Sequence, residues 1–225
     1  MRDKRPALIL YITAVTLAMI AKVFEFETLM LISKPIVVPA IYYYYLQAKR
    51  EKINLLFSIS VWSFFVADMI IVLYSKSAIL SIMVCGMISY SGLTWFGLKD
   101  AKNIKFSAVN VLVLALLLLL PSYMLFRILN LDVEDISGHY SVYLLYGVIL
   151  LTLVGVSIYN YISNATDAFL YLCVASVCML LSDVFYCVHK YMIELPVFDN
   201  INLLAQLISY FFMVKYFISR KRTKA

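Results

Sequence analysis

Long runs of apolar residues follow one another along the whole chain and are separated by short polar connections. The runs cover roughly residues 6–23, 29–47, 53–74, 78–98, 106–126, 140–162, 168–189 and 200–218. A helix needs about 20 predominantly apolar residues to cross a bilayer, and these runs lack the alternation that a membrane β-strand requires. The pattern therefore predicts an all-α bundle of eight transmembrane helices that forms a single integral membrane domain over residues 1–225.

Amino-acid composition leads to the same protein class. Hydrophobic residues make up 64% of the chain and charged residues only 14%, with a mean hydropathy of +0.91, whereas soluble domains contain about 25% charged residues. The net charge of +6 does not indicate nucleic-acid binding, because the basic residues gather between the apolar runs. We expect a multi-pass protein of the cell (inner) membrane with the lipid bilayer as its partner; the sequence predicts no oligomeric state.

The positions of lysine and arginine predict how the helices are oriented. Cytoplasmic connections of membrane proteins carry an excess of these residues. On alternate connections lie 13 of the 19: Arg2, Lys4, Arg5, Lys49, Arg50, Lys52, Lys99, Lys102, Lys105, Arg220, Lys221, Arg222 and Lys224. Both termini are therefore expected in the cytoplasm. The longest connection is residues 127–139, so we expect consecutive helices to be antiparallel neighbours.

Four polar residues inside the predicted helices lie at a similar distance from the outer boundary. Lys34 is five residues inside its helix, and Asp68, Asp183 and Gln206 are each six residues from the outer ends of theirs. At about 1.5 Å per residue, all four lie roughly 8–9 Å below the boundary. Because an ionised carboxylate in hydrocarbon is costly, such residues face the protein interior and are candidates for function. We expect these four side chains to meet.

Two carboxyl groups beside one ammonium group suggest acid and base chemistry. In a low dielectric, the lysine can keep one acid ionised while the other stays protonated. Glycosidases use such a pair to cleave a bond through an oxocarbenium ion, and an enol ether could be cleaved in the same way. Asp68 and Asp183 are the candidate catalytic residues. The candidate supporting or substrate-binding residues are Lys34, Ser182, Tyr186 and Gln206.

Two other interpretations of these charged residues remain open. Asp68, Asp183 and Lys34 could form a buried ion-pair network that only fixes helix packing in a membrane scaffold. They could also serve a small-molecule or proton-coupled transporter, in which buried charges are equally natural. We expect no metal and no cofactor. Only two histidines are present, the four cysteines lack the short paired spacing of a zinc site, and no nucleotide-binding motif occurs.

Short motifs on four of the predicted helices resemble those of a known family. They are Lys34-Pro35, Val66-Ala-Asp68, Leu181-Ser-Asp183 and Ala205-Gln206. In their order and helix placement they resemble the YhhN family of eight-helix membrane proteins, and the resemblance covers essentially the whole chain. The characterised animal members of this family are lysoplasmalogenases. The chain departs from the family at Ala67, where glycine is usual, and at Gly92-Leu-Thr-Trp95, where a His-x-x-Tyr pattern is frequent.

The resemblance implies a lysophospholipid-like substrate. The enzyme would hydrolyse the vinyl ether bond of a lysoplasmalogen to a fatty aldehyde and glycerophosphocholine or glycerophosphoethanolamine. One of Asp68 and Asp183 would protonate the enol ether while the other, as a carboxylate, would activate water or steady the cation. Lys34 would hold the ionised acid or meet the substrate phosphate. Which acid takes which role is not predicted.

Overall fold

Helices make up nearly all of the chain that the computed structural model describes, which is residues 5–48, 53–74, 78–101, 107–131 and 133–220. Within these residues there is no strand, and eight helices are long and apolar enough to cross a membrane. The prediction of a multi-pass helical membrane protein is confirmed. The helices are α1 (Arg5–Val23), α2 (Glu27–Ala48), α3 (Leu55–Tyr74), α4 (Ile79–Ala101), α5 (Ala108–Leu129), α6 (Glu134–Ser137), α7 (Tyr140–Ser163), α8 (Asp167–Tyr191) and α9 (Pro196–Ser219).

The helix boundaries differ from the predicted ones by a few residues. The largest difference at a start is in α9, which begins at Pro196 instead of residue 200. Proline suits the first helical position because its missing N–H would have had no partner there. The one-turn helix α6 lies in the connection between α5 and α7 and was not predicted. The predicted start of the fifth span, residue 106, lies outside the described residues.

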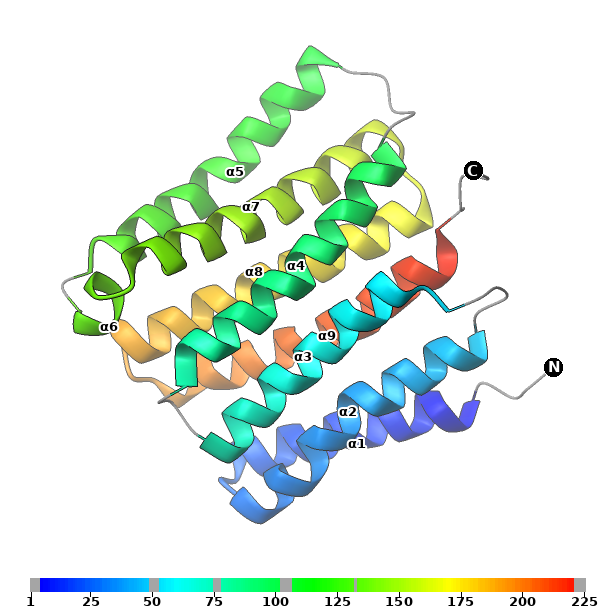
Figure 1. Cartoon of the computed structure of the whole chain (residues 1–225), viewed down its shortest axis with the longest axis vertical. Helices are drawn as coiled ribbons and strands as arrows, with labels where there is room; N and C mark the ends of the chain where they lie inside the picture. The colour runs from blue at the N-terminus through cyan, green and yellow to red at the C-terminus, as the bar shows by residue number, and fades with distance from the viewer. Residues whose placement is uncertain (1–4, 49–52, 75–77, 102–106, 132, 221–225) are drawn as a thin grey trace.

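Six helices form a closed ring in which each packs against the next. The order around the ring is α2, α3, α4, α7, α8 and α9, and α9 returns to α2. Helix α1 packs against α2 and α9 on one side, and α5 packs against α7 on the other (Figure 1). Consecutive helices are therefore neighbours for most of the chain, but α7 separates α5 from α4. This closed arrangement creates an interior that can exclude lipid.

The start of α1 and the end of α9 lie at the same end of the bundle, together with the end of α4 (Figure 1). We call this the inner end, after the predicted cytoplasmic orientation, and the opposite one the outer end. Lys99 and Arg220 belong to the inner end. The other cations used for the prediction, apart from Arg5 at the start of α1, lie outside the described residues: Arg2, Lys4, Lys49, Arg50, Lys52, Lys102, Lys105, Lys221, Arg222 and Lys224.

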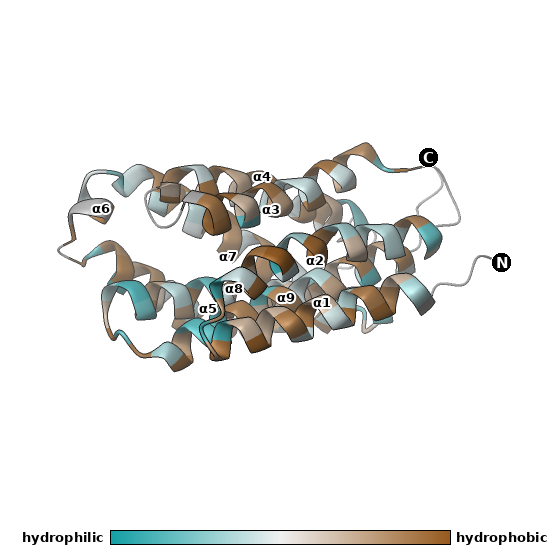
Figure 2. Ribbon diagram, turned by 90° about the horizontal axis from the view of Figure 1, so that it is seen from below, coloured by the Kyte–Doolittle hydropathy of each residue, from teal (hydrophilic) through white to brown (hydrophobic). Residues whose placement is uncertain are grey.

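The outward surface of the bundle is hydrophobic, as a lipid-facing surface must be. Hydrophobic residues occur along the length of the helices (Figure 2). Helix α5 is the extreme case, because almost none of its residues are buried and Leu120 is 69% exposed. Among the described residues, α7 is the one helix that α5 packs against closely.

Aromatic side chains pack inside the ring of helices near the inner end. Phe57 of α3 stacks on Phe217 of α9 with centroids 4.0 Å apart, and Phe96 of α4 packs edge-on against Phe217. Next to these rings, the guanidinium group of Arg220 stacks on the face of Phe96 and forms an ion pair with Asp100. The inner end is thus closed by stacked rings and a salt bridge.

Glycines on α4 let the neighbouring helices approach closely, as small residues commonly do in membranes. A Cβ atom at Gly97 would lie 2.9 Å from Val156 of α7 and 3.3 Å from Leu172 of α8. The Gly97 carbonyl also accepts a hydrogen bond from the buried Asn160 amide at 2.9 Å. Gly97 therefore belongs to the contact that joins α4 to α7 and α8.

We expect Gly97→Leu to destabilise the bundle by about 1–3 kcal/mol, because the new side chain would overpack this contact. Thermal unfolding of the purified protein in detergent measures the effect. Leu120→Ala on the exposed face of α5 is the control and should leave the unfolding midpoint nearly unchanged. Equal midpoints for the two variants would contradict the packing described for α4.

Candidate functional site

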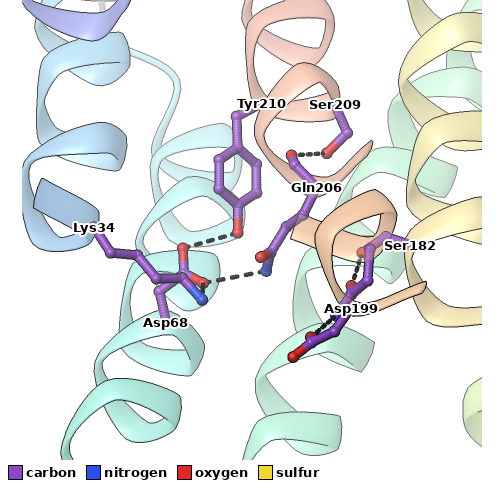
Figure 3. Close-up of polar contacts among 8 residues, drawn as sticks. Lys34, Asp68, Ser182, Asp199, Gln206, Ser209 and Tyr210 are labelled. Carbon is purple, nitrogen blue, oxygen red and sulfur yellow. Dashed lines mark hydrogen bonds and ion pairs between the residues drawn. The ribbon is translucent and has the colours of Figure 1, made fainter. Parts of the chain in front are cut away.

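A buried ion pair lies at the contact of α2, α3 and α9. The Lys34 ammonium is 3.2 Å from Asp68 Oδ1, and both side chains are almost fully buried, with 6% and 1% exposed. The Gln206 amide donates to the same oxygen at 3.1 Å, and the Tyr210 hydroxyl donates to Oδ2 at 2.9 Å. Figure 3 shows the three side chains converging on the Asp68 carboxylate. Three donors, one of them charged, therefore surround the Asp68 carboxyl group.

The helix period explains how α9 supplies two of these donors. Gln206 and Tyr210 are four residues apart, so they lie one above the other on the same face of α9. The buried Leu203 and Leu207 lie close to that face and pack in the main hydrophobic core. The predicted contacts of Lys34 with Asp68 and of Gln206 with Asp68 are both present.

Asp183 belongs to a different contact, that of α8 with α4 and α7. Its Oδ2 atom accepts hydrogen bonds from the hydroxyl groups of Tyr90 at 2.9 Å and of Tyr146 at 2.7 Å. Asp183 is half-buried, whereas Asp68 is fully buried. Within the described residues, no cationic side chain lies within salt-bridge distance of Asp183. The two acids therefore have different partners: a cation for one and neutral hydroxyl groups for the other.

A row of packed aromatic rings links the contacts of the two acids. The Phe64 ring packs against Tyr90 at 5.7 Å between centroids and against Tyr210 at 5.3 Å. Tyr90 and Tyr210 each donate to one of the acids, so the row connects the Asp183 contact with the Asp68 contact. Asp183 does not join the group formed by Lys34, Asp68 and Gln206, because its side chain is directed toward α4 and α7.

Ser182 and Tyr186, the other expected supporting residues, do not contact either acid through a hydrogen bond in the described part of the chain. The Ser182 hydroxyl donates to the Asn202 side chain at 2.7 Å, and the Asn202 amide lies 3.5 Å from Asp199. Ser182 points away from Asp183 because adjacent residues on a helix are about 100° apart. Tyr186 is half-buried.

Ser182 forms part of a polar network nearer the outer end. Lys22 of α1 forms an ion pair with Asp199, and the His189 Nε2 atom lies 3.8 Å from the same carboxylate. Figure 3 shows Ser182 and Asp199 as a group apart from the Asp68 carboxylate. The network joins α1, α8 and α9 and extends from Ser182, at the level of Asp183, toward the outer end.

Three tyrosines were missed by the sequence analysis: Tyr90, Tyr146 and Tyr210. The chain contains 18 tyrosines, and an uncharged residue of that frequency does not stand out in an apolar helix as an aspartate does. Tyr210 carried a usable signal, because it lies one helical turn after Gln206. Tyr90 and Tyr146 could not be found in this way, since their partner Asp183 is on another helix.

Two surface hollows lie elsewhere on the bundle. One, of about 330 Å³, is an apolar groove between α1 and α9 that Tyr11 and Phe211 help to line. The other, of about 610 Å³, lies at the connection from α1 to α2 beside Glu25 and Glu27. Neither is lined by Asp68 or Asp183. Among the described residues, no group of three or more His, Cys, Asp or Glu side chains is placed to hold a metal ion.

Comparisons of the chain with protein-family models, with curated proteins and with solved structures gave no significant match. The resemblance to the YhhN family therefore rests on the four short motifs alone. In the structure, their charged and amide residues lie on α2, α3, α8 and α9.

We expect Lys34→Met to destabilise the protein by about 3–5 kcal/mol, because Asp68 would be left buried without a cation. Thermal unfolding in detergent measures the loss. Lys22→Met removes the cation of the partly exposed pair with Asp199, whose side chains are 30% and 27% exposed, and should cost only about 0–1 kcal/mol. The double variant Lys34→Met/Asp68→Asn should recover part of the loss, since no charge then lacks a partner. Similar losses of stability for Lys34→Met and Lys22→Met would contradict the expectation that the buried ion pair costs more to break than the partly exposed one.

Proposed function

We propose that the protein is a membrane hydrolase that cleaves the vinyl ether bond of a lysoplasmalogen-like lipid, with Asp183 as the proton donor. The observation that carries the proposal is the difference between the two intramembrane acids. Asp68 has Lys34 as a partner and is fully buried. Asp183 is half-buried, and its donors in the described part of the chain are the neutral hydroxyl groups of two tyrosines. Paired-acid hydrolysis needs this division into an ionised group and a proton donor.

The reaction balances with water as the only co-substrate. Asp183 transfers its proton to the vinyl carbon farther from the ether oxygen, which leaves an oxocarbenium ion on the adjacent carbon. Water adds to that carbon and loses a proton to the Asp183 carboxylate. The resulting hemiacetal breaks its carbon–oxygen bond and gives a fatty aldehyde and the free glycerol hydroxyl group. General acid catalysis of this kind contributes roughly 10²–10⁴-fold to a rate.

Asp68 would act in this scheme as a fixed negative charge within the same bundle. Lys34 pairs with it, and two neutral donors bond to its oxygens. The apolar outward surface would accept the single hydrocarbon tail of the substrate, beside residues such as Leu181, which is 42% exposed one position before Ser182. The polar head group would then lie toward the outer end, where Lys22, His189 and Asp199 form their network.

A second candidate is a non-catalytic membrane scaffold, which the complete burial of the Lys34–Asp68 pair favours. Every oxygen of the Asp68 carboxylate has a donor, and the pair joins three helices. A group with this environment can serve packing alone. The two candidates make different predictions for Asp183, because a scaffold role needs no proton donor at that position.

The decisive measurement is aldehyde release from lysoplasmenylethanolamine and lysoplasmenylcholine by the purified protein. We expect Asp183→Asn to lower the rate about 10²–10⁴-fold while the variant still elutes as a folded bundle. Asp167→Asn, an exposed aspartate in the first turn of the same helix, is the matched control and should keep full activity.

Two results would overturn the proposal. A folded parent protein that releases no aldehyde from either lipid is not a lysoplasmalogenase, and the scaffold role then becomes the better explanation. Full activity in a folded Asp183→Asn variant would show that another group supplies the proton.

A further inference from the structure

Both tyrosine hydroxyl groups at Asp183 meet the same carboxyl oxygen. Tyr90 and Tyr146 approach Oδ2 at 2.9 and 2.7 Å, and their own oxygens are 3.3 Å apart. Hydroxyl hydrogen bonds usually measure about 2.5–3.0 Å, so the single hydrogen of Tyr146 is better placed on the bond to Asp183 than on the bond to Tyr90. Each tyrosine then donates one hydrogen to Oδ2.

Two donors occupy the two lone pairs of a carboxyl oxygen. Oδ2 of Asp183 is therefore fully used, whereas Oδ1 accepts no hydrogen bond from the residues whose structure is described. The carboxyl group of Asp68 differs, since both of its oxygens have donors. When Asp183 carries a proton, the hydrogen bonds leave Oδ1 as the atom that can hold it.

The position of Tyr146 depends on a glycine of the neighbouring helix. A Cβ atom at Gly86 of α4 would lie 2.9 Å from Cε2 and 3.2 Å from the hydroxyl oxygen of Tyr146. Gly86 lies one turn before Tyr90 on α4, so the same face of α4 provides one hydroxyl donor and the space for the other. The two rings also pack against each other at 5.6 Å.

Tyr90 is fixed from its other side. It is only 4% exposed, and its ring packs against Phe64 of α3. Its hydroxyl oxygen therefore has little freedom to leave Asp183. Together, α3, α4 and α7 hold both donors against a carboxyl group that α8 supplies.

We propose that Tyr90 and Tyr146 are positioning residues that bind Oδ2 of Asp183 and thereby present the proton on Oδ1 to a substrate. The inference rests on the proposed function where it assigns this proton to a vinyl ether. The geometry that it describes can be tested without any lipid substrate.

Dicyclohexylcarbodiimide, an apolar reagent, tests which intramembrane acid has an available proton. The acidic hydrogen moves to a nitrogen of the reagent while the carboxyl oxygen bonds to its central carbon, and an acyl shift to nitrogen gives a stable N-acylurea that contains all atoms of both reactants. In the purified full-length protein at neutral pH, we expect peptide mass spectrometry to find the adduct on Asp183 and not on Asp68. Asp183→Asn should abolish it.

The outcomes of this labelling separate the inference from the proposed function. No adduct on Asp183, or an adduct on Asp68 of equal yield, overturns the inference even if the protein releases aldehyde. An adduct on Asp183 in a protein that releases no aldehyde supports the presented proton and rejects the vinyl ether hydrolase.

Removing one donor tests the positioning role itself. In Tyr146→Phe, the Asp183 carboxylate loses a hydrogen bond that favours its ionised form, so labelling should become several-fold faster. Aldehyde release should fall roughly tenfold in kcat with little change in KM, because the acid is no longer oriented. Loss of folding would instead slow the labelling, since water would then ionise the carboxyl group.

Matched variants complete this test. Tyr143→Phe is on the same helix as Tyr146 and removes a hydroxyl group that bonds to Tyr191. It should leave the rates of labelling and of aldehyde release unchanged.

Gly86→Ala keeps the Tyr146 hydroxyl but displaces the ring, and it should change both rates in the same directions as Tyr146→Phe. Gly155→Ala, whose new Cβ would meet only the end of the Leu118 side chain, should not. Identical behaviour of Tyr146→Phe and Tyr143→Phe overturns the assignment.

Discussion

The rule that a polar group in hydrocarbon must have a partner governs the arrangement of this bundle. Lys34 and Asp68 satisfy it together, and neither could remain buried alone. Their pair connects α2 with α3, and the donors Gln206 and Tyr210 add α9. Segments distant in sequence, near the two ends of the chain, are thereby held at one point. The closed ring of helices depends on this contact, because α9 must return to α2 for every donor to be in place.

The second acid satisfies the same rule in a less complete way. Asp183 lies about as deep as Asp68, eight residues from the end of α8 against six residues from the end of α3. Its partners are hydroxyl groups, which stabilise a carboxyl group without neutralising its charge. The Phe64 ring packs against both Tyr90 and Tyr210, but the hydrogen bonds of the two acids form separate groups among the described residues. Among the described residues, both oxygens of Asp68 therefore have donors, whereas Oδ1 of Asp183 has none.

The sequence predicted the helices and half of the candidate site, for physical reasons that differ between residues. Apolar runs of span length define the eight long helices, but the single turn of α6 is too short to leave such a pattern. The distance of each residue from the outer boundary was enough to predict correctly that Lys34, Asp68 and Gln206 meet. It could not place Asp183, because depth gives the level of a residue and not the direction in which its helix faces. Tyr90 and Tyr146 were missed, since their role depends on the packing of α4 against α7, which Gly86 permits beside Tyr146.

The two ends of the ring interior differ in a way that bears on function. Near the inner end, Phe57, Phe96 and Phe217 are stacked and the Asp100–Arg220 pair lies beside them. A transporter would have to open this end and expose a polar site to each side in turn, which requires the stacked rings and the salt bridge to separate in every cycle. A lipid hydrolase needs access from one side only, and the half-buried Asp183 lies nearer the outer end of α8 than its inner end. An outward-facing transporter has a closed inner end as well, so the choice between the two functions rests on the chemistry of Asp183 and not on this packing.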